Sequence, residues 1–80
     1  MGFFDKIFGN PKKQEADSRF QKGIWYLQSN DFENALYEFK KATEIAPELP
    51  HAWEMRGKMH RTLGNEAEAL YCFDKMKELR

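Results

Sequence analysis

The sequence contains no valine, and its other β-branched residues are few: Ile7, Ile24, Ile45, Thr43 and Thr62. Strands favour such residues because they pack well on a pleated surface. Helices instead accept the alanine, leucine, methionine, glutamate, lysine and glutamine that are common here. This composition excludes a fold built on a β-sheet, so we expect an all-α protein.

Cysteine is almost absent as well, since Cys72 is the only one among 80 residues. A lone cysteine cannot form an internal disulfide, which agrees with a reducing compartment. Apolar runs such as residues 24–27 are far shorter than the roughly 20 residues of a transmembrane helix. The N-terminus also lacks the basic start, long apolar stretch and cleavage site of a secretory signal. We expect a cytoplasmic protein.

Neither sign of charge is in excess, because 13 basic residues balance 13 acidic ones. A neutral chain has no overall field that favours nucleic acid or an anionic membrane. The pair Lys12-Lys13 is too short to form a nucleic-acid patch. We therefore expect no nucleic-acid partner.

Residues that could carry chemistry are also few. His51, His60 and Cys72 are the only soft metal-ligand candidates, and no pair has the spacing of a zinc site. A nucleophile–base pair of Cys72 and His60 stays open, but no third orienting group and no oxyanion-binding glycine loop is evident. A phosphate-binding glycine motif is missing too. We expect no metal, no cofactor and no enzymatic activity.

Turn-forming residues divide what remains into four helical stretches. The breaks are Asn10-Pro11, Asn30-Asp31, residues 47–50 and Gly64-Asn65. Between them, apolar residues recur every three or four positions, which is the period of a helix. The predicted helices are 13–29, 32–46, 50–63 and 66–79. The short connections make successive helices antiparallel neighbours.

The residues at these breaks also predict how the helices begin and end. Asp31 is a good N-cap, and Pro50 suits the first turn of a helix. Gly64 can take the left-handed conformation that ends a helix. Asn65 follows as an N-cap, and Glu68 three residues later could complete a capping box.

The second half of the sequence repeats the first at a constant offset, the one that carries Gly23 onto Gly57. The other identical pairs at this offset are Ala35 and Ala69, Leu36 and Leu70, Tyr37 and Tyr71, Phe39 and Phe73, Lys41 and Lys75, and Glu44 and Glu78. A fixed period in this range marks a repeat in which each unit buries its apolar face on its neighbour.

These residues resemble the tetratricopeptide repeat, whose pattern is W-x₂-L-G-x₂-Y, then A-x₃-F, then P. The first unit, about 16–49, supplies Gly23, Tyr26, Ala35, Phe39 and Pro47. The second, about 50–80, supplies Trp53, Gly57, Ala69 and Phe73. The resemblance implies an α-solenoid of antiparallel helix–turn–helix units, in which small residues let helices approach closely and aromatic rings fill the adjacent space.

The sequence departs from this pattern at four positions. Arg19 stands at the tryptophan position of the first unit, and His60 at the tyrosine position of the second. Lys22 and Arg56 replace the leucine in both units. Long basic side chains can cover apolar surface with their stems while their heads reach water.

We expect residues 1–12 to form an apolar N-terminal segment with a linker, and residues 13–80 to form a two-repeat domain. The next proline of the pattern would fall at position 81, so we expect neither a third unit nor a capping helix after Arg80. Roughly three repeats are usually needed for stability. The last helix would leave Phe73, Met76 and Leu79 partly uncovered, and a homo-oligomer is therefore expected.

The resemblance implies a scaffold or interaction module that binds a partner protein or peptide in a concave groove. Carried over by position, the groove residues are Phe20, Gln21, Ile24, Leu27, Gln28, His51, Glu54, Met55, Lys58, Arg61 and Thr62. The first unit contributes an apolar half and the second a polar half with net positive charge. This combination suits a peptide with one hydrophobic anchor and a nearby acidic group. In the alternative interpretation, Phe20, Ile24 and Leu27 pack against a neighbouring repeat or subunit.

The N-terminal segment lies outside the resemblance. If it is helical, Phe3, Phe4, Ile7 and Phe8 share one face. Three interpretations stay open: the segment caps the repeats or fills the groove, from its own chain or a second one; it contacts a membrane; or it is a disordered tail. The single lysine, Lys6, and the lack of a basic polar face weaken the membrane interpretation. A self-assembling oligomer and a peripheral membrane adaptor are thus the alternatives to a peptide-binding module.

Overall fold

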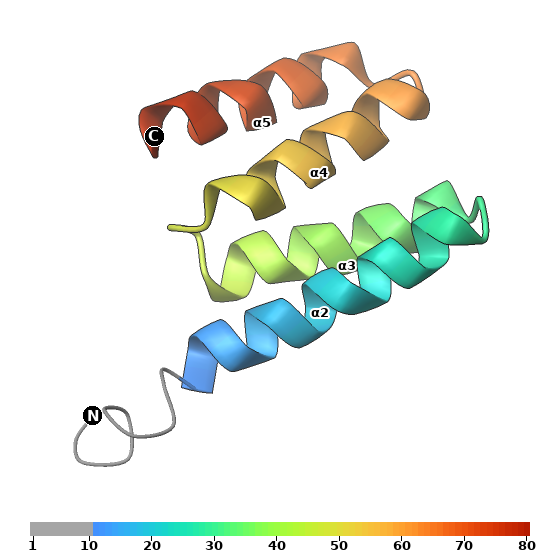
Figure 1. Cartoon of the computed structure of the whole chain (residues 1–80). Coiled ribbons are helices and arrows are strands. Elements are labelled where there is room, and N and C mark those ends of the chain that lie inside the picture. The colour runs from blue at the N-terminus through green and yellow to red at the C-terminus, as the bar shows by residue number, and fades with distance from the viewer. Residues whose placement is uncertain (1–10) are drawn as a thin grey trace.

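A computed structural model describes residues 11–80 of the chain, and these residues form four helices (Figure 1). The helices are α2 (Pro11–Gln28), α3 (Phe32–Ile45), α4 (Pro50–Thr62) and α5 (Glu66–Glu78). No strand occurs in this range, so the predicted all-α class is confirmed. The predicted contact residues Phe3, Phe4, Ile7 and Phe8 lie outside the described residues.

The helices begin where local chemistry favours it. Pro11 opens α2 two residues before the predicted start. Proline fits there because its fixed φ suits a helix and the missing N–H has no partner in a first turn. The Asp31 carboxylate accepts a hydrogen bond from the backbone N–H of Asn34 at 3.3 Å, as an N-cap should. Pro50 opens α4, as predicted.

The turns between paired helices have a similar backbone conformation in both repeats. Asn30 and Gly64, which occupy equivalent positions of the two repeats, both have positive φ, at 60° and 84°. The left-handed prediction for Gly64 is therefore confirmed. The capping-box prediction is wrong, because Asn65 makes no side-chain cap bond to α5. Its amide nitrogen instead lies 3.4 Å from Nδ1 of His60.

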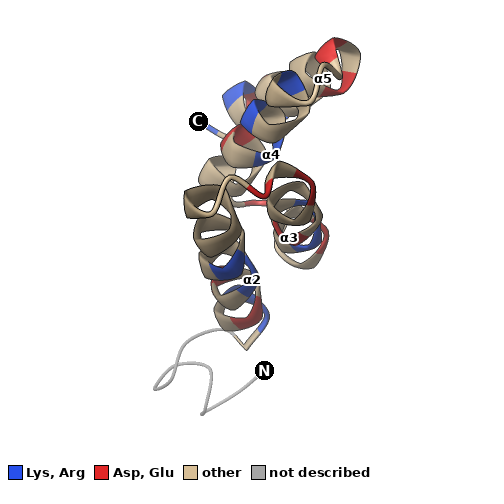
Figure 2. Ribbon diagram, turned by 90° about the vertical axis from the view of Figure 1, so that its right-hand side faces the viewer, with Lys and Arg blue, Asp and Glu red and all other residues tan. Residues whose placement is uncertain are grey.

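The four helices form two antiparallel pairs that stack on each other. Helix α2 packs on α3, α4 packs on α5, and α3 packs on α4 to join the pairs. Figure 1 shows this order from α2 to α5, and the view in Figure 2 shows α2 beside α3 with the second pair above them. In the part of the chain that the structure describes, no helix combines the length and the apolar character needed to cross a membrane.

In each helix pair, a glycine of one helix packs against a phenylalanine ring of the other. A Cβ added at Gly23 would lie 2.5 Å from the ring of Phe39, and one added at Gly57 would lie 2.8 Å from that of Phe73. The same contact thus recurs at equivalent positions of the two repeats. It explains how glycine lets the paired helices approach closely in both repeats.

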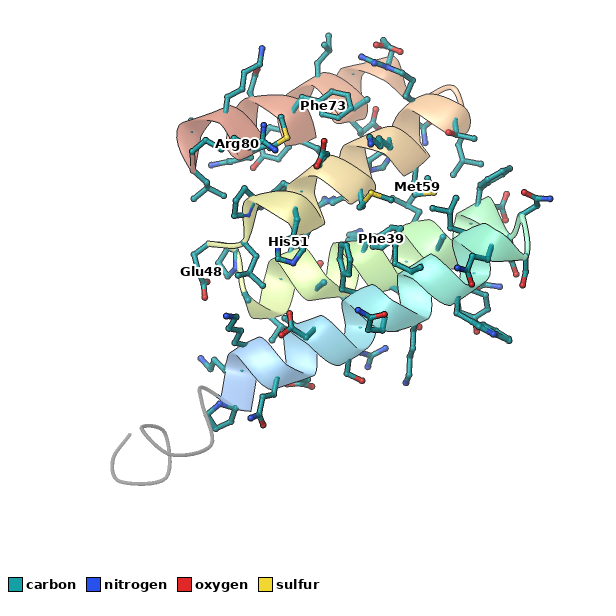
Figure 3. All side chains as sticks on the ribbon, in the orientation of Figure 1. Phe39, Glu48, His51, Met59, Phe73 and Arg80 are labelled. Atoms are coloured by element: carbon teal, nitrogen blue, oxygen red, sulfur yellow. The ribbon has the colours of Figure 1, made fainter. Side chains whose placement is uncertain are left out.

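The two repeats share one hydrophobic core. Its buried cluster joins Ala35 and Phe39 of the first repeat to Met59 of the second (Figure 3). Half-buried side chains pack around this cluster, among them Phe32, Leu36 and Met55. Because the cluster crosses the boundary, each repeat completes the core of the other.

Candidate binding surface on α2 and α4

The residues predicted to line a groove all lie on α2 and α4, and we call their combined surface the α2/α4 face. The exposed members are Gln21, Gln28, His51, Lys58, Arg61 and Thr62. The half-buried members are Phe20, Ile24, Leu27, Glu54 and Met55. The apolar residues are therefore the less accessible part of this surface.

The apolar half of the α2/α4 face contacts the core between the repeats. Phe20, Ile24 and Leu27 pack against the cluster of Ala35, Phe39 and Met59. The ring of Phe20 lies 5.3 Å from that of Phe39 and 4.8 Å, edge to face, from that of His51. Each of these side chains is thus partly buried against the core and partly exposed.

The polar half is crossed by ion pairs. Glu54 lies 3.9 Å from the Lys58 ammonium and 3.8 Å from the Arg80 guanidinium. Arg61 lies 3.2 Å from the Glu66 carboxylate, and its guanidinium is stacked 4.8 Å from the centre of the Phe73 ring. Arg61 thereby covers part of the apolar flank that the sequence predicts to be open.

Comparison with known proteins decides the family. The family model described as tetratricopeptide repeat matches residues 16–49, the first of the two predicted units. The four helices of the structure fit two such units. The chain belongs to the tetratricopeptide repeat family. It is also 35% identical over 60 residues to an uncharacterized protein of Methanocaldococcus jannaschii, an alignment that spans 75% of this chain and 70% of that protein.

The first tetratricopeptide repeat replaces its tryptophan with a partly buried ion pair. Arg19, at the tryptophan position, donates a hydrogen bond to the Glu38 carboxylate at 3.1 Å. Glu38 is buried, and its hydrogen bond raises the pKa of the Arg19 guanidinium. Sequence reasoning missed Glu38, because a glutamate in a helix is usually exposed to solvent.

The second tetratricopeptide repeat keeps the tryptophan and alters the leucine. The Trp53 indole N–H donates to the Pro47 carbonyl at 2.8 Å, and the Arg56 guanidinium lies 5.0 Å from the ring centre. Arg56 also donates from Nη1 to the Thr43 hydroxyl of the first repeat at 2.9 Å. The arginine at the leucine position therefore covers an aromatic ring and bridges the two repeats.

Buried titratable groups lie on the inner side of the second repeat. Burial raises the pKa of the Cys72 thiol, so the reactive thiolate is disfavoured. Burial, followed by the nearby Arg56 cation, lowers the pKa of His60. An activated nucleophile needs the opposite shift at cysteine. These two residues are consistent with packing roles inside a tetratricopeptide repeat.

Proposed function

We propose that the chain is a protein–protein interaction module that binds a partner peptide across the α2/α4 face. Tetratricopeptide repeats generally mediate contacts between proteins. The observation that carries the proposal is the arrangement of this face. Exposed polar side chains at Gln21, Gln28 and Lys58 lie on the same two helices as the half-exposed apolar residues Ile24 and Met55. Such a mixture can orient a peptide by hydrogen bonds and hold it by an apolar contact.

The charges of this face favour an acidic group on the peptide. Lys58 and Arg80 share one carboxylate, Glu54, and both distances are close to the limit of an ion pair. One positive charge at this position is therefore unbalanced. A carboxylate of the peptide could approach Lys58 while a neighbouring apolar side chain contacts Met55. The partner proposed here is an acidic peptide with one hydrophobic anchor.

The test uses peptides selected for binding to the 80-residue chain from a displayed random library. Their affinity is then measured by isothermal titration calorimetry for the native chain and for the double variant Gln21→Ala with Lys58→Ala. Both residues are exposed, so the fold should persist. We expect Kd to rise by about tenfold or more, corresponding to the loss of roughly 1.4 kcal/mol.

The matched control is Glu33→Ala with Tyr37→Ala, two exposed residues on α3 away from this face. Its Kd should stay within about twofold of the native value. Equal affinities for the native chain and both double variants would place peptide binding elsewhere and overturn the proposal.

A further inference from the structure

The two repeats differ sharply at one set of equivalent positions. Phe20, Ile24 and Leu27 of α2 correspond, at the offset that relates Gly23 to Gly57, to Glu54, Lys58 and Arg61 of α4. Three apolar side chains are thus replaced by three charged ones. The backbone contacts around them, by contrast, are repeated, as the paired glycines and phenylalanines demonstrate.

In the first repeat these positions lie beside the second repeat, and the Phe20 ring contacts that of His51. Phe20, Ile24 and Leu27 are half-buried against a cluster that includes Met59 of α4. Leu36 of α3 packs against the same cluster. This is the face by which one repeat receives the next along the stack.

In the second repeat the same face carries charges that form ion pairs within that repeat. Glu54 forms ion pairs with both Lys58 and Arg80. Arg61 forms an ion pair with Glu66 and stacks on the Phe73 ring. Figure 2 shows acidic and basic residues interspersed along α4 and α5. Leu70, the equivalent of Leu36, is 52% exposed.

A further repeat with the shape of the second would also meet a repulsive contact. Arg56 of α4 reaches back to the Thr43 hydroxyl of the first repeat at 2.9 Å. The residue equivalent to Thr43 in the second repeat is Lys77. An incoming arginine would therefore face a lysine, in addition to burying the charges of α4.

We infer that the second repeat carries its own polar cap, made of Glu54, Lys58, Arg61, Glu66, Lys77 and Arg80. The cap covers Phe73 and prevents another apolar repeat, or the apolar face of a second copy, from stacking on this end. Burying charges without full compensation is unfavourable, and a polar outer face is what keeps the end of a repeat stack soluble. The inference concerns the end of the stack and does not depend on peptide binding.

The test extends the chain after Arg80 with a second copy of residues 47–80, which preserves the period of the repeat. One version keeps the native cap. The other replaces it with residues of the first repeat, by Glu54→Phe, Lys58→Ile, Arg61→Leu and Lys77→Thr in the central repeat. We expect the added repeat to raise the urea midpoint of unfolding only in the second version. An equal rise in both versions would overturn the inference.

A second measurement covers the case in which the extended chains fold poorly. In the 80-residue chain, Glu54→Phe with Lys58→Ile and Arg61→Leu should cause concentration-dependent association in sedimentation velocity. The matched control, Glu54→Lys with Lys58→Glu and Arg61→Glu, keeps the face charged and should sediment as the native chain does. The cap would be contradicted if the native chain associated and the charge-reversed control did not.

Discussion

Gly23 and Gly57 occupy equivalent positions, but the phenylalanine rings packed against them are buried to different degrees. The Phe39 ring over Gly23 is fully buried, whereas the Phe73 ring over Gly57 is half-buried beneath the Arg61 side chain. A methyl group at either position would meet a ring at less than 3.0 Å. Only the Phe73 ring has room to move away from it.

We therefore predict that Gly23→Ala destabilises the protein more than Gly57→Ala does. Overpacking in a closed core costs about 1–3 kcal/mol, while alanine gains about 1 kcal/mol over glycine in a helix. Gly23→Ala should lower the free energy of unfolding by about 1–2 kcal/mol, and Gly57→Ala should leave it nearly unchanged. Urea denaturation of the two variants measures this, and equal losses would contradict the prediction.

Some residue roles could be predicted from the sequence and others could not. The cap at Asp31 and the left-handed Gly64 depend on neighbours within a few positions, so local rules were sufficient. The Arg19–Glu38 pair joins residues on two different helices, and its burial depends on how α2 and α3 pack. Asn65 occupies the predicted N-cap position of α5 but makes no side-chain cap bond, and its amide nitrogen lies 3.4 Å from Nδ1 of His60 on another helix.

At the scale of helices, Arg56 is the principal polar contact between the repeats. Its Nη1 atom bonds Thr43 across the α3–α4 boundary, yet its Nε atom is buried with no hydrogen-bond partner. Thr43 retains its own bond to the Lys40 carbonyl at 2.7 Å. Removing the arginine would thus leave no orphaned group on Thr43.

We predict that Arg56→Leu, which restores the residue of the family pattern, leaves the free energy of unfolding unchanged or raises it by about 1 kcal/mol. The reason is that replacing a charge in a buried contact by an apolar side chain of similar volume is often neutral or stabilising. Arg56→Ala should instead lower stability, because it exposes the Trp53 ring and leaves a cavity. Thermal and urea unfolding of the two variants distinguish these outcomes, and a large loss in Arg56→Leu would refute the first.

Arg56→Leu should also raise the pKa of His60, because it removes the Arg56 cation. That cation is, after burial, the second cause that lowers this pKa. Titration of the His60 ring by NMR, in the native chain and in the variant, reads this directly. A folded-state pKa below the ordinary value of about 6.5 makes His60 contribute stability above that pH, which is lost as pH falls through the folded pKa.

Helix positions were predicted closely, since proline, glycine and caps mark them locally. The contacts made by the apolar half of the α2/α4 face could not be predicted in the same way. Phe20, Ile24 and Leu27 have the helical spacing of either a binding surface or a packing surface. Their contact with the cluster that contains Met59, a residue of the other repeat, depends on how the helices pack and could not be read from the spacing.

At the scale of the whole molecule, the shared core makes the two repeats interdependent. Because the cluster of Ala35, Phe39 and Met59 spans both, unfolding either repeat exposes apolar surface of the other. We predict a single cooperative transition in urea. Helix content by circular dichroism, which reports all four helices, should follow the same curve as thiol labelling of Cys72, which reports only the second repeat.

Cys72 suits this purpose because it is 1% exposed in the folded state. Its labelling therefore requires opening of the second repeat. Two separated midpoints, with Cys72 reacting before half of the helix signal is lost, would show that the repeats unfold independently.

The two tryptophans differ sharply in their exposure to solvent. Trp25 of the first repeat is 62% exposed, whereas Trp53 of the second is 7% exposed and hydrogen-bonded through its indole nitrogen. Indole fluorescence shifts to the red in water and is quenched by solutes that reach the ring. Each repeat therefore contains its own optical reporter. A molecule that covers Trp25 on α2 would shield its ring from a quencher and leave the emission of Trp53 unchanged.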